Sequence, residues 1–90
     1  MNNKIALESM AMDLKRVALG YHTKSLTMAK RFHEEAVKRK NEIDTTQIKP
    51  YLYPILEKIV TIQNQNHERI AEDALMFSVL IQNYARKFLA

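Results

Sequence analysis

Three histidines are the side chains of this sequence best suited to acid–base or metal chemistry: His22, His33 and His67. A metal site on helices needs ligands three or four residues apart, so that they face the same way. No carboxylate lies three residues before any of these histidines, and the two glutamates near His33 follow it directly. We therefore predict no metal and no cofactor, and expect the histidines to be solvated on polar helix faces.

The composition excludes several other kinds of site. With a single glycine, the chain cannot build a glycine-rich loop of the kind that cradles phosphates. It has no cysteine, which excludes disulfides, thiolate metal sites and cysteine nucleophiles. No arrangement of serine, histidine and aspartate typical of a hydrolase stands out. The sequence favours a protein without catalysis of its own.

Arg16 and His22 form the one spacing that matches a known catalytic pattern, in the stretch RVALGYH. This spacing resembles the Arg-x4–6-His motif of the HEPN superfamily, helical proteins that often dimerise and include metal-independent ribonucleases. The resemblance implies that Arg16 would hold a phosphate and that His22 would assist attack by a ribose 2′-hydroxyl. Val17 follows the arginine, where the family usually has a polar residue, and the motif lies in the first half of the chain. A HEPN-like ribonuclease is the second alternative function.

Basic residues are concentrated between residues 13 and 40, which contain eight lysines and arginines and three acidic residues, in a chain of net charge +4. A basic surface is what a phosphate backbone requires of its partner, so nucleic-acid binding is the first alternative function. Charge runs are more often solvated helix faces, and cations near a helix C-terminus complement the helix dipole. The candidate contacts are Lys15, Arg16, Lys24, Lys30, Arg31, Lys38, Arg39 and Lys40.

The composition also predicts the fold class. One glycine and two prolines in 90 residues are too few for the many turns of a multi-stranded sheet. Most of the remaining residues are strong helix formers. We therefore predict a single all-α domain over residues 1–90.

The first half of the chain has the hydrophobic spacing of one long helix, from about Asn3 to Ile43. This stripe crosses Gly20 without losing phase, and a glycine costs a helix only about 1 kcal/mol relative to alanine. We favour a continuous or mildly kinked helix. In the alternative, a helix ends near Gly20 and Thr23 or Ser25 caps the next one. The stripe consists of Leu7, Met10, Leu14, Val17, Tyr21, Met28, Ala29, Phe32, Ala36 and Ile43.

A break in the middle of the chain is indicated by Pro50 and Pro54, which both follow the N-cap side chains of the segment Asp44-Thr45-Thr46. A proline inside an established helix lacks a donor and clashes with the preceding turn. We therefore expect a connection from Asp44 to Tyr53, with room for a short helical turn, and a helix that begins near Pro54.

A second hydrophobic stripe runs from Ile55 to Phe88 and is interrupted by the polar segment QNQNHER, residues 63–69. This segment is either a polar patch on a helix or a short break. Asn66 lies on the stripe, and a buried asparagine in a helical seam can set register and oligomeric state. From Ile70 onward the apolar residues spread over so much of the circumference that the helix should be covered on several sides.

Two helices of about 35–40 residues would be roughly 55–60 Å long, and a hairpin of two such helices cannot close a core alone. Pairing two hairpins gives a dimeric four-helix bundle with two-fold symmetry, which is the architecture that we favour. The alternative is a monomeric four-helix bundle of short helices, with breaks near Gly20 and near residues 64–66.

The function that fits these observations best is that of a small helical interaction or structural protein. It would act through homodimerisation or by docking a helical partner. We expect a soluble, cytoplasmic protein without a membrane partner, because no apolar run approaches the ~18 residues of a membrane span. Glu8 and Asp13 also lie where an export signal would be apolar.

Overall fold

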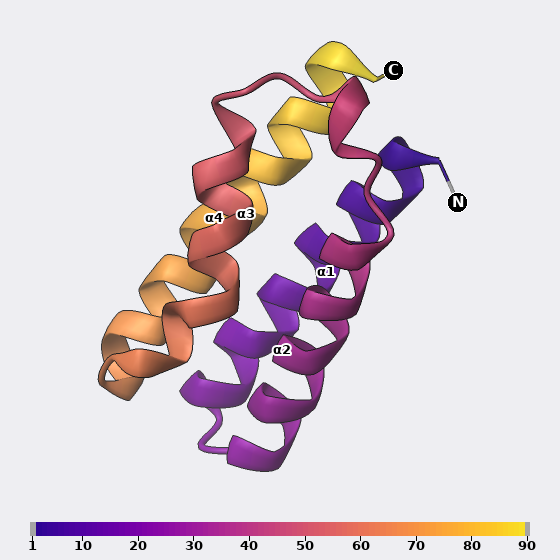
Figure 1. Cartoon of the computed structure of the whole chain (residues 1–90). Helices are drawn as coiled ribbons and strands as arrows, with labels where there is room; N and C mark the ends of the chain where they lie inside the picture. Colours follow the sequence, from indigo (N-terminus) through magenta and orange to yellow (C-terminus); the bar gives the residue numbers. More distant parts are fainter. Residues whose placement is uncertain (1, 90) are drawn as a thin grey trace.

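The computed structural model describes residues 2–89 and is built from helices joined by short turns (Figure 1). No strand occurs in the described residues, so the predicted all-α class is confirmed. The elements in chain order are α1 (Asn3–His22), α2 (Leu26–Asn41), the 3₁₀ turn η1 (Thr45–Gln47), α3 (Leu52–Thr61), the 3₁₀ turn η2 (Ile62–Asn64) and α4 (His67–Phe88).

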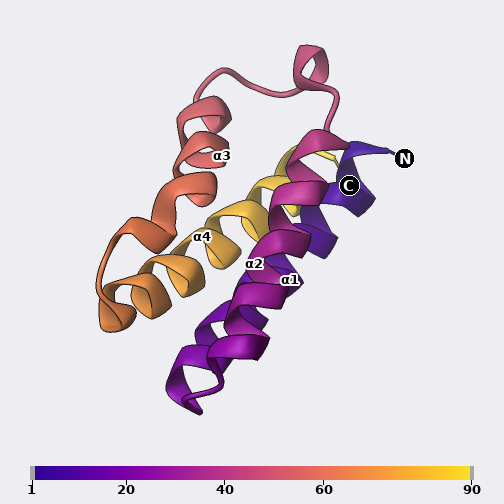
Figure 2. The ribbon, with the colours of Figure 1, turned by 60° about the horizontal axis from the view of Figure 1, so that its bottom comes forward.

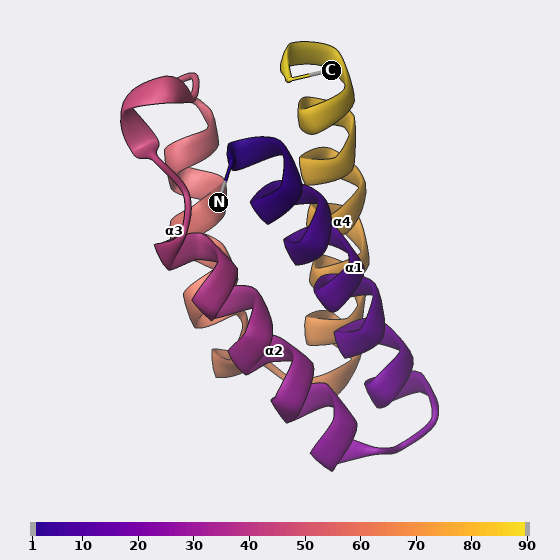
Figure 3. The same cartoon turned by 90° about the vertical axis from the view of Figure 1, so that its right-hand side faces the viewer.

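Helix α1 packs closely along both α2 and α4, while α3 lies between α2 and α4 on the side away from α1 (Figures 2 and 3). The radius of gyration is 12.3 Å, close to the roughly 12 Å of a compact domain of this length. The longest dimension is 36 Å, which is too short for helices of 55–60 Å. The prediction of two long helices is therefore wrong, and the four shorter helices of the alternative are present. Dimerisation stays a prediction.

The turn between α1 and α2 explains why the first long helix does not form. Lys24 has a φ of 59°, the left-handed conformation, and directly follows the C-cap residue Thr23. The Ser25 N–H donates to the Gly20 carbonyl over 2.7 Å, and the Lys24 N–H donates to the Tyr21 carbonyl over 3.3 Å. This pair of bonds is a Schellman motif, in which a lysine takes the place usually held by glycine. Ser25 then caps α2 by accepting from the Met28 N–H.

Gly20 has another role, which is to let α1 and α2 approach each other. It is helical and buried, and a Cβ atom built on it would lie 2.7 Å from the backbone nitrogen of Ala29 and 2.9 Å from its Cα. Both distances are shorter than real Cβ contacts. Glycine is required here by the close approach of the two helices, and not by the conformation of the turn.

The connection between α2 and α3 lies where the prolines predicted it, with the short turn η1 inside it. The side chain of Asn3 holds this connection against α1. Its Nδ2 donates to the Asp44 carbonyl over 2.9 Å, and its Oδ1 accepts from the Asp44 N–H over 2.8 Å. Helix α3 begins at Leu52, two residues before the predicted start. Pro54 is tolerated because the N–H groups of a first helical turn have no partner within the helix.

The polar segment 63–69 contains a break between η2 and α4, and the break ends at Asn66, directly before α4. Asn66 is exposed, and its side chain accepts a hydrogen bond from the Arg69 N–H over 2.9 Å as the N-cap of α4. The prediction that Asn66 sets register inside a helical seam is therefore wrong. An asparagine followed by a helix has a more common use, which is to satisfy the free N–H groups of the first turn.

The core is formed by the predicted stripes, although they lie on shorter helices. Tyr21 and Phe32 are only partly buried and pack against its edge. The central side chains of α1 and α4 have almost no exposed surface, which places the seam between these two helices at the centre of the core. The larger buried members include Leu7, Met10, Leu14, Val17, Leu52, Leu56, Ile59, Ile70, Phe77, Ile81 and Tyr84.

Replacing Gly20 with alanine should destabilise the protein. In an open helix this change would stabilise by about 1 kcal/mol, but here the new methyl group would press on the Ala29 backbone. We expect a net loss of about 1–3 kcal/mol, the usual cost of overpacking. Urea unfolding followed by circular dichroism measures it, and a stabilised variant would contradict the close approach.

Replacing Lys24 with glycine should have the opposite effect. Lysine in the left-handed conformation is strained by about 1 kcal/mol, and glycine adopts that conformation without strain. We expect Lys24→Gly to raise the free energy of unfolding by up to about 1 kcal/mol in the same assay. An unchanged or lowered value would contradict the strain that we assign to Lys24.

Candidate interaction surface

The most unusual surface feature is an apolar patch on the outward side of α4. Leu75, Met76, Val79 and Leu80 are between 42 and 48% exposed. At 100° per residue these four positions span about 140° of the helix, opposite the buried face that carries Phe77 and Ile81. We call these four residues the α4 outer patch. Helix α4 is therefore apolar around most of the circumference of its central part. The rest of the protein covers only one side of this helix.

The large exposed apolar residues of α1 are more scattered. Ile5, Met12 and Leu19 on α1 are separated by seven residues each, with polar or small side chains on the surface between them. Single exposed apolar residues are normal on soluble proteins, whereas contiguous ones mark contact surfaces. Tyr51 and Phe88 are also exposed and line a cavity together with Leu80. The α4 outer patch is a contiguous group that lies on one side of a single helix.

Charged residues flank the α4 outer patch with opposite signs at its two ends. Glu68 and Glu72 lie on the N-terminal side, and Arg86 and Lys87 lie on the C-terminal side. All four are exposed, and none forms an ion pair with another described residue. This arrangement suits the helix dipole, which favours acids near the N-terminus and bases near the C-terminus.

A second cluster of charge lies between α1 and α2, around the buried side chain of Asp13. Asp13 is 6% exposed, with Oδ1 3.5 Å from Nη1 of Arg16 and Oδ2 4.0 Å from Nε of Arg39. The Asp13 Oδ2 and Arg39 Nε atoms are buried without a hydrogen-bond partner in the described residues. Burial raises the pKa of Asp13 above its ordinary value of 3.8, although both arginines act in the opposite direction. This cluster joins the two helices and offers no open site.

The two residues of the ribonuclease-like spacing have different surroundings. Arg16 is paired with Asp13, and its guanidinium lies over the Phe32 ring, 5.2 Å from the centroid. His22 is the exposed last residue of α1. No hydrogen bond or ion pair links Arg16 to His22 in the described part of the chain.

The sequence predicts three solvated histidines, but one of them is buried in the structure. His67 is exposed and stacks against Tyr21, with ring centroids 5.0 Å apart. His33 is buried, and its Nε2 lies 2.8 Å from the carbonyl oxygen of Ile59. Because a carbonyl oxygen only accepts, Nε2 carries the proton. The expectation is therefore wrong for His33, which ties α2 to the last turn of α3.

The candidate nucleic-acid contacts are distributed over both helices, and half of them are paired with acids. Lys38 pairs with Glu35, and Lys40 pairs with Glu57 over 3.0 Å. Arg16 and Arg39 belong to the cluster around Asp13, and Arg39 also pairs with a second carboxylate. The remaining four are the partly or fully exposed residues Lys15, Lys24, Lys30 and Arg31; Lys15 donates to Gln82 and Arg31 lies over the Phe32 ring.

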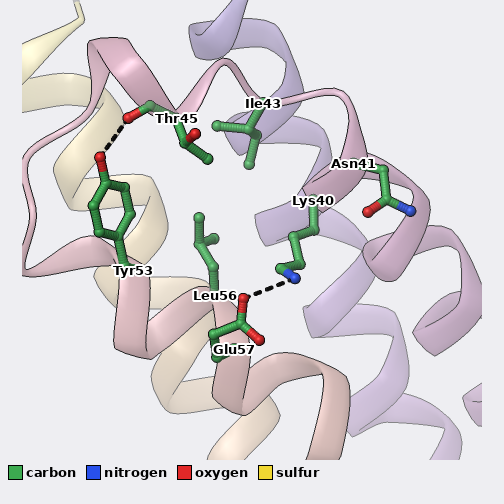
Figure 4. Close-up of a pocket in the computed structure, with 7 residues that line it drawn as sticks. All are labelled: Lys40, Asn41, Ile43, Thr45, Tyr53, Leu56 and Glu57. Carbon is green, nitrogen blue, oxygen red and sulfur yellow. Dashed lines mark hydrogen bonds and ion pairs between the residues drawn. The ribbon is translucent and has the colours of Figure 1, made fainter.

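A cavity of about 500 Å³ opens between the end of α2 and the start of α3 (Figure 4). The hydroxyl of Tyr53 donates to the Thr45 carbonyl over 2.6 Å on one side of it. On the other side, Lys40 and Glu57 neutralise each other. The two charged side chains of this cavity pair with each other, so neither is a free charge for a ligand. Its lining residues are Lys40, Asn41, Ile43, Thr45, Tyr53, Leu56 and Glu57.

Within residues 2–89, no three histidine, aspartate or glutamate side chains are grouped closely enough to hold a metal ion. None of the described helices combines the length and hydrophobicity needed to cross a membrane. No protein-family model, curated protein or solved structure matches the chain. The inference of function therefore rests on the surfaces described above.

Replacing His33 with phenylalanine should destabilise the protein. The variant keeps a buried aromatic ring but leaves the Ile59 carbonyl without its donor. An unsatisfied buried polar group costs about 1–3 kcal/mol, and we expect a loss in that range. His22→Phe, at an exposed position, is the matched control for urea unfolding. Equal stabilities of the two variants would contradict the role of His33.

The buried Asp13 should make stability depend on pH in a defined direction. Since its pKa is raised in the folded state, folding favours the protonated form, and that stabilisation is lost as pH rises from 3.8 through the raised value. Wild type should therefore lose stability relative to Asp13→Asn over this range. Urea unfolding at a series of pH values measures the difference. A wild type that gains on the variant as pH rises would mean a lowered pKa.

Proposed function

We propose that this protein is a helical interaction module without catalysis of its own, and that the α4 outer patch is its contact surface. The observation that supports the proposal is the contiguous exposure of Leu75, Met76, Val79 and Leu80 on one side of a helix whose other side fills the core. Apolar side chains at this spacing are what a partner helix buries when it docks along a helix.

The expected gain from covering this patch is substantial for a small protein. Full burial of a side chain such as leucine or methionine is worth about 1.5–3 kcal/mol, and these four are already about half buried, as their exposures show. A partner would therefore gain roughly 1 kcal/mol from each, before the cost of association.

The two alternatives have less support. Nucleic-acid binding needs cations that are free to face phosphates, and four of the eight candidates pair with carboxylates in the fold. A HEPN-like ribonuclease needs Arg16 to reach a phosphate beside His22, and the guanidinium of Arg16 is paired with Asp13. We therefore rank both below the interaction module.

Photo-cross-linking in the cells that produce the protein tests this proposal. A photoreactive residue at Val79 should give discrete protein adducts, because the side chain lies in the middle of the α4 outer patch. The same residue at Lys30, exposed on α2, is the matched control and should give few or none. A lack of adducts at Val79, or equal adducts at both positions, would contradict the proposal.

A further inference from the structure

The α4 outer patch is complementary to itself. Two copies of α4 that run in opposite directions can meet about a two-fold axis between Met76 and Val79. This arrangement places Leu75 beside Val79 of the second copy, and Met76 beside Leu80 of the second copy. Each apolar side chain then meets an apolar side chain, which is what an isologous interface requires.

The charges at the ends of the patch match the same arrangement. Glu68 lies about as far before the centre of the patch as Arg86 lies after it, and both lie on the same flank of the helix. In an antiparallel pair, Glu68 of one copy therefore faces Arg86 of the other, at both ends of the interface. Nearer the centre, Glu72 faces Asn83, whose amide can donate to the carboxylate.

The charges on the other flank of α4, which carries Arg69 and Lys87, are compatible with this antiparallel pairing. There Lys87 would face Arg69 of the second copy, but Arg69 is paired with Asp73 of its own helix over 3.7 Å. A parallel pair, by contrast, would place each Glu68 beside the other Glu68 and each Arg86 beside the other Arg86. Because like charges that face each other are unfavourable, antiparallel docking is preferred.

We propose that the occupant of the α4 outer patch is a second copy of this chain, docked with its α4 antiparallel. This inference rests on the proposed function and names its partner. The core side of α4 is filled within one chain, so the dimer joins two folded subunits. Four side chains from each copy make a small interface, and such dimers exchange with monomers.

The molar mass in solution, measured by light scattering over roughly 1 μM to 1 mM protein, tests whether a second copy binds the α4 outer patch. We expect a concentration-dependent dimer that Val79→Glu weakens about a hundredfold or more, because a carboxylate would be buried at the two-fold axis. Leu19→Glu, at an equally exposed apolar position of α1, is the matched control and should leave the dimer intact. A monomer at every concentration, or equal effects of both variants, would overturn the inference.

Charge reversal tests the orientation. Glu68→Arg and Arg86→Glu should each weaken the dimer about tenfold, because each creates two repulsive pairs. An equimolar mixture of the two variants should recover wild-type affinity. Glu34→Arg, an exposed charge reversal on α2, should have no effect. Single variants that dimerise as well as wild type would overturn the antiparallel arrangement.

Cysteine cross-linking is a second test of the antiparallel orientation, and it is feasible because the chain has no cysteine of its own. A mixture of Glu72→Cys and Asn83→Cys proteins should be joined by a short thiol cross-linker. Glu72→Cys alone should not be joined, because the two copies of residue 72 would lie about 16 Å apart along the helix axis. Cross-linking of Glu72→Cys alone would indicate a parallel pair and overturn the inference.

The outcomes separate this inference from the proposed function. If the purified protein is monomeric but Val79 forms adducts with a different protein in cells, the interaction module stands and the second copy is wrong. If Val79 forms no adducts and the purified protein is monomeric, both proposals fail. A dimer that is insensitive to Val79→Glu also overturns the inference, since it must use another surface.

Discussion

The close approach of α1 and α2 at Gly20 and Ala29 is the constraint on which the rest of the structure depends. A side chain at position 20 would hold the helices apart where the chain reverses. With the helices in contact, the left-handed Lys24 completes the reversal through two backbone hydrogen bonds. Because the chain turns here, α1 packs against α2 as well as against α4. The outer side of α4 is consequently left facing solvent.

The same close contact explains why a charge can be buried between these helices. Asp13 lies on the side of α1 that faces α2, so packing the two helices removes it from water. Arg16 and Arg39 offset part of the cost of burial, but the distance of 4.0 Å between Oδ2 and Nε leaves two polar atoms without hydrogen bonds. Buried ion pairs of this kind add little net stability, yet removing one partner is costly. The contact of Asp13 with Arg39 therefore joins α1 to α2 without adding much net stability.

Helix type, the core stripes and the central connection were predictable from the sequence, because hydrophobic spacing and proline each have local physical causes. The turn after α1 was not, since hydrophobic periodicity reports which side of a helix is buried but not where its axis changes direction. A glycine at position 24 would have predicted a turn, but the residue there is a lysine, which does not. The role of His33 depends on a carbonyl 26 residues away, which no local pattern indicates. For α4, the sequence indicated an apolar surface too wide for a single helix contact. It did not indicate which part of that surface would remain exposed.

The division of α4 into a filled inner side and an apolar outer side has a consequence for how association relates to folding. Ile70, Ala74, Phe77 and Ile81 are buried within a single chain, so the subunit completes its core without a partner. In dimers whose subunits share one core, stability cannot be separated from protein concentration. The association that we propose for the outer patch would therefore add contacts to a fold that is complete without them. Removing those contacts would leave the helices in place.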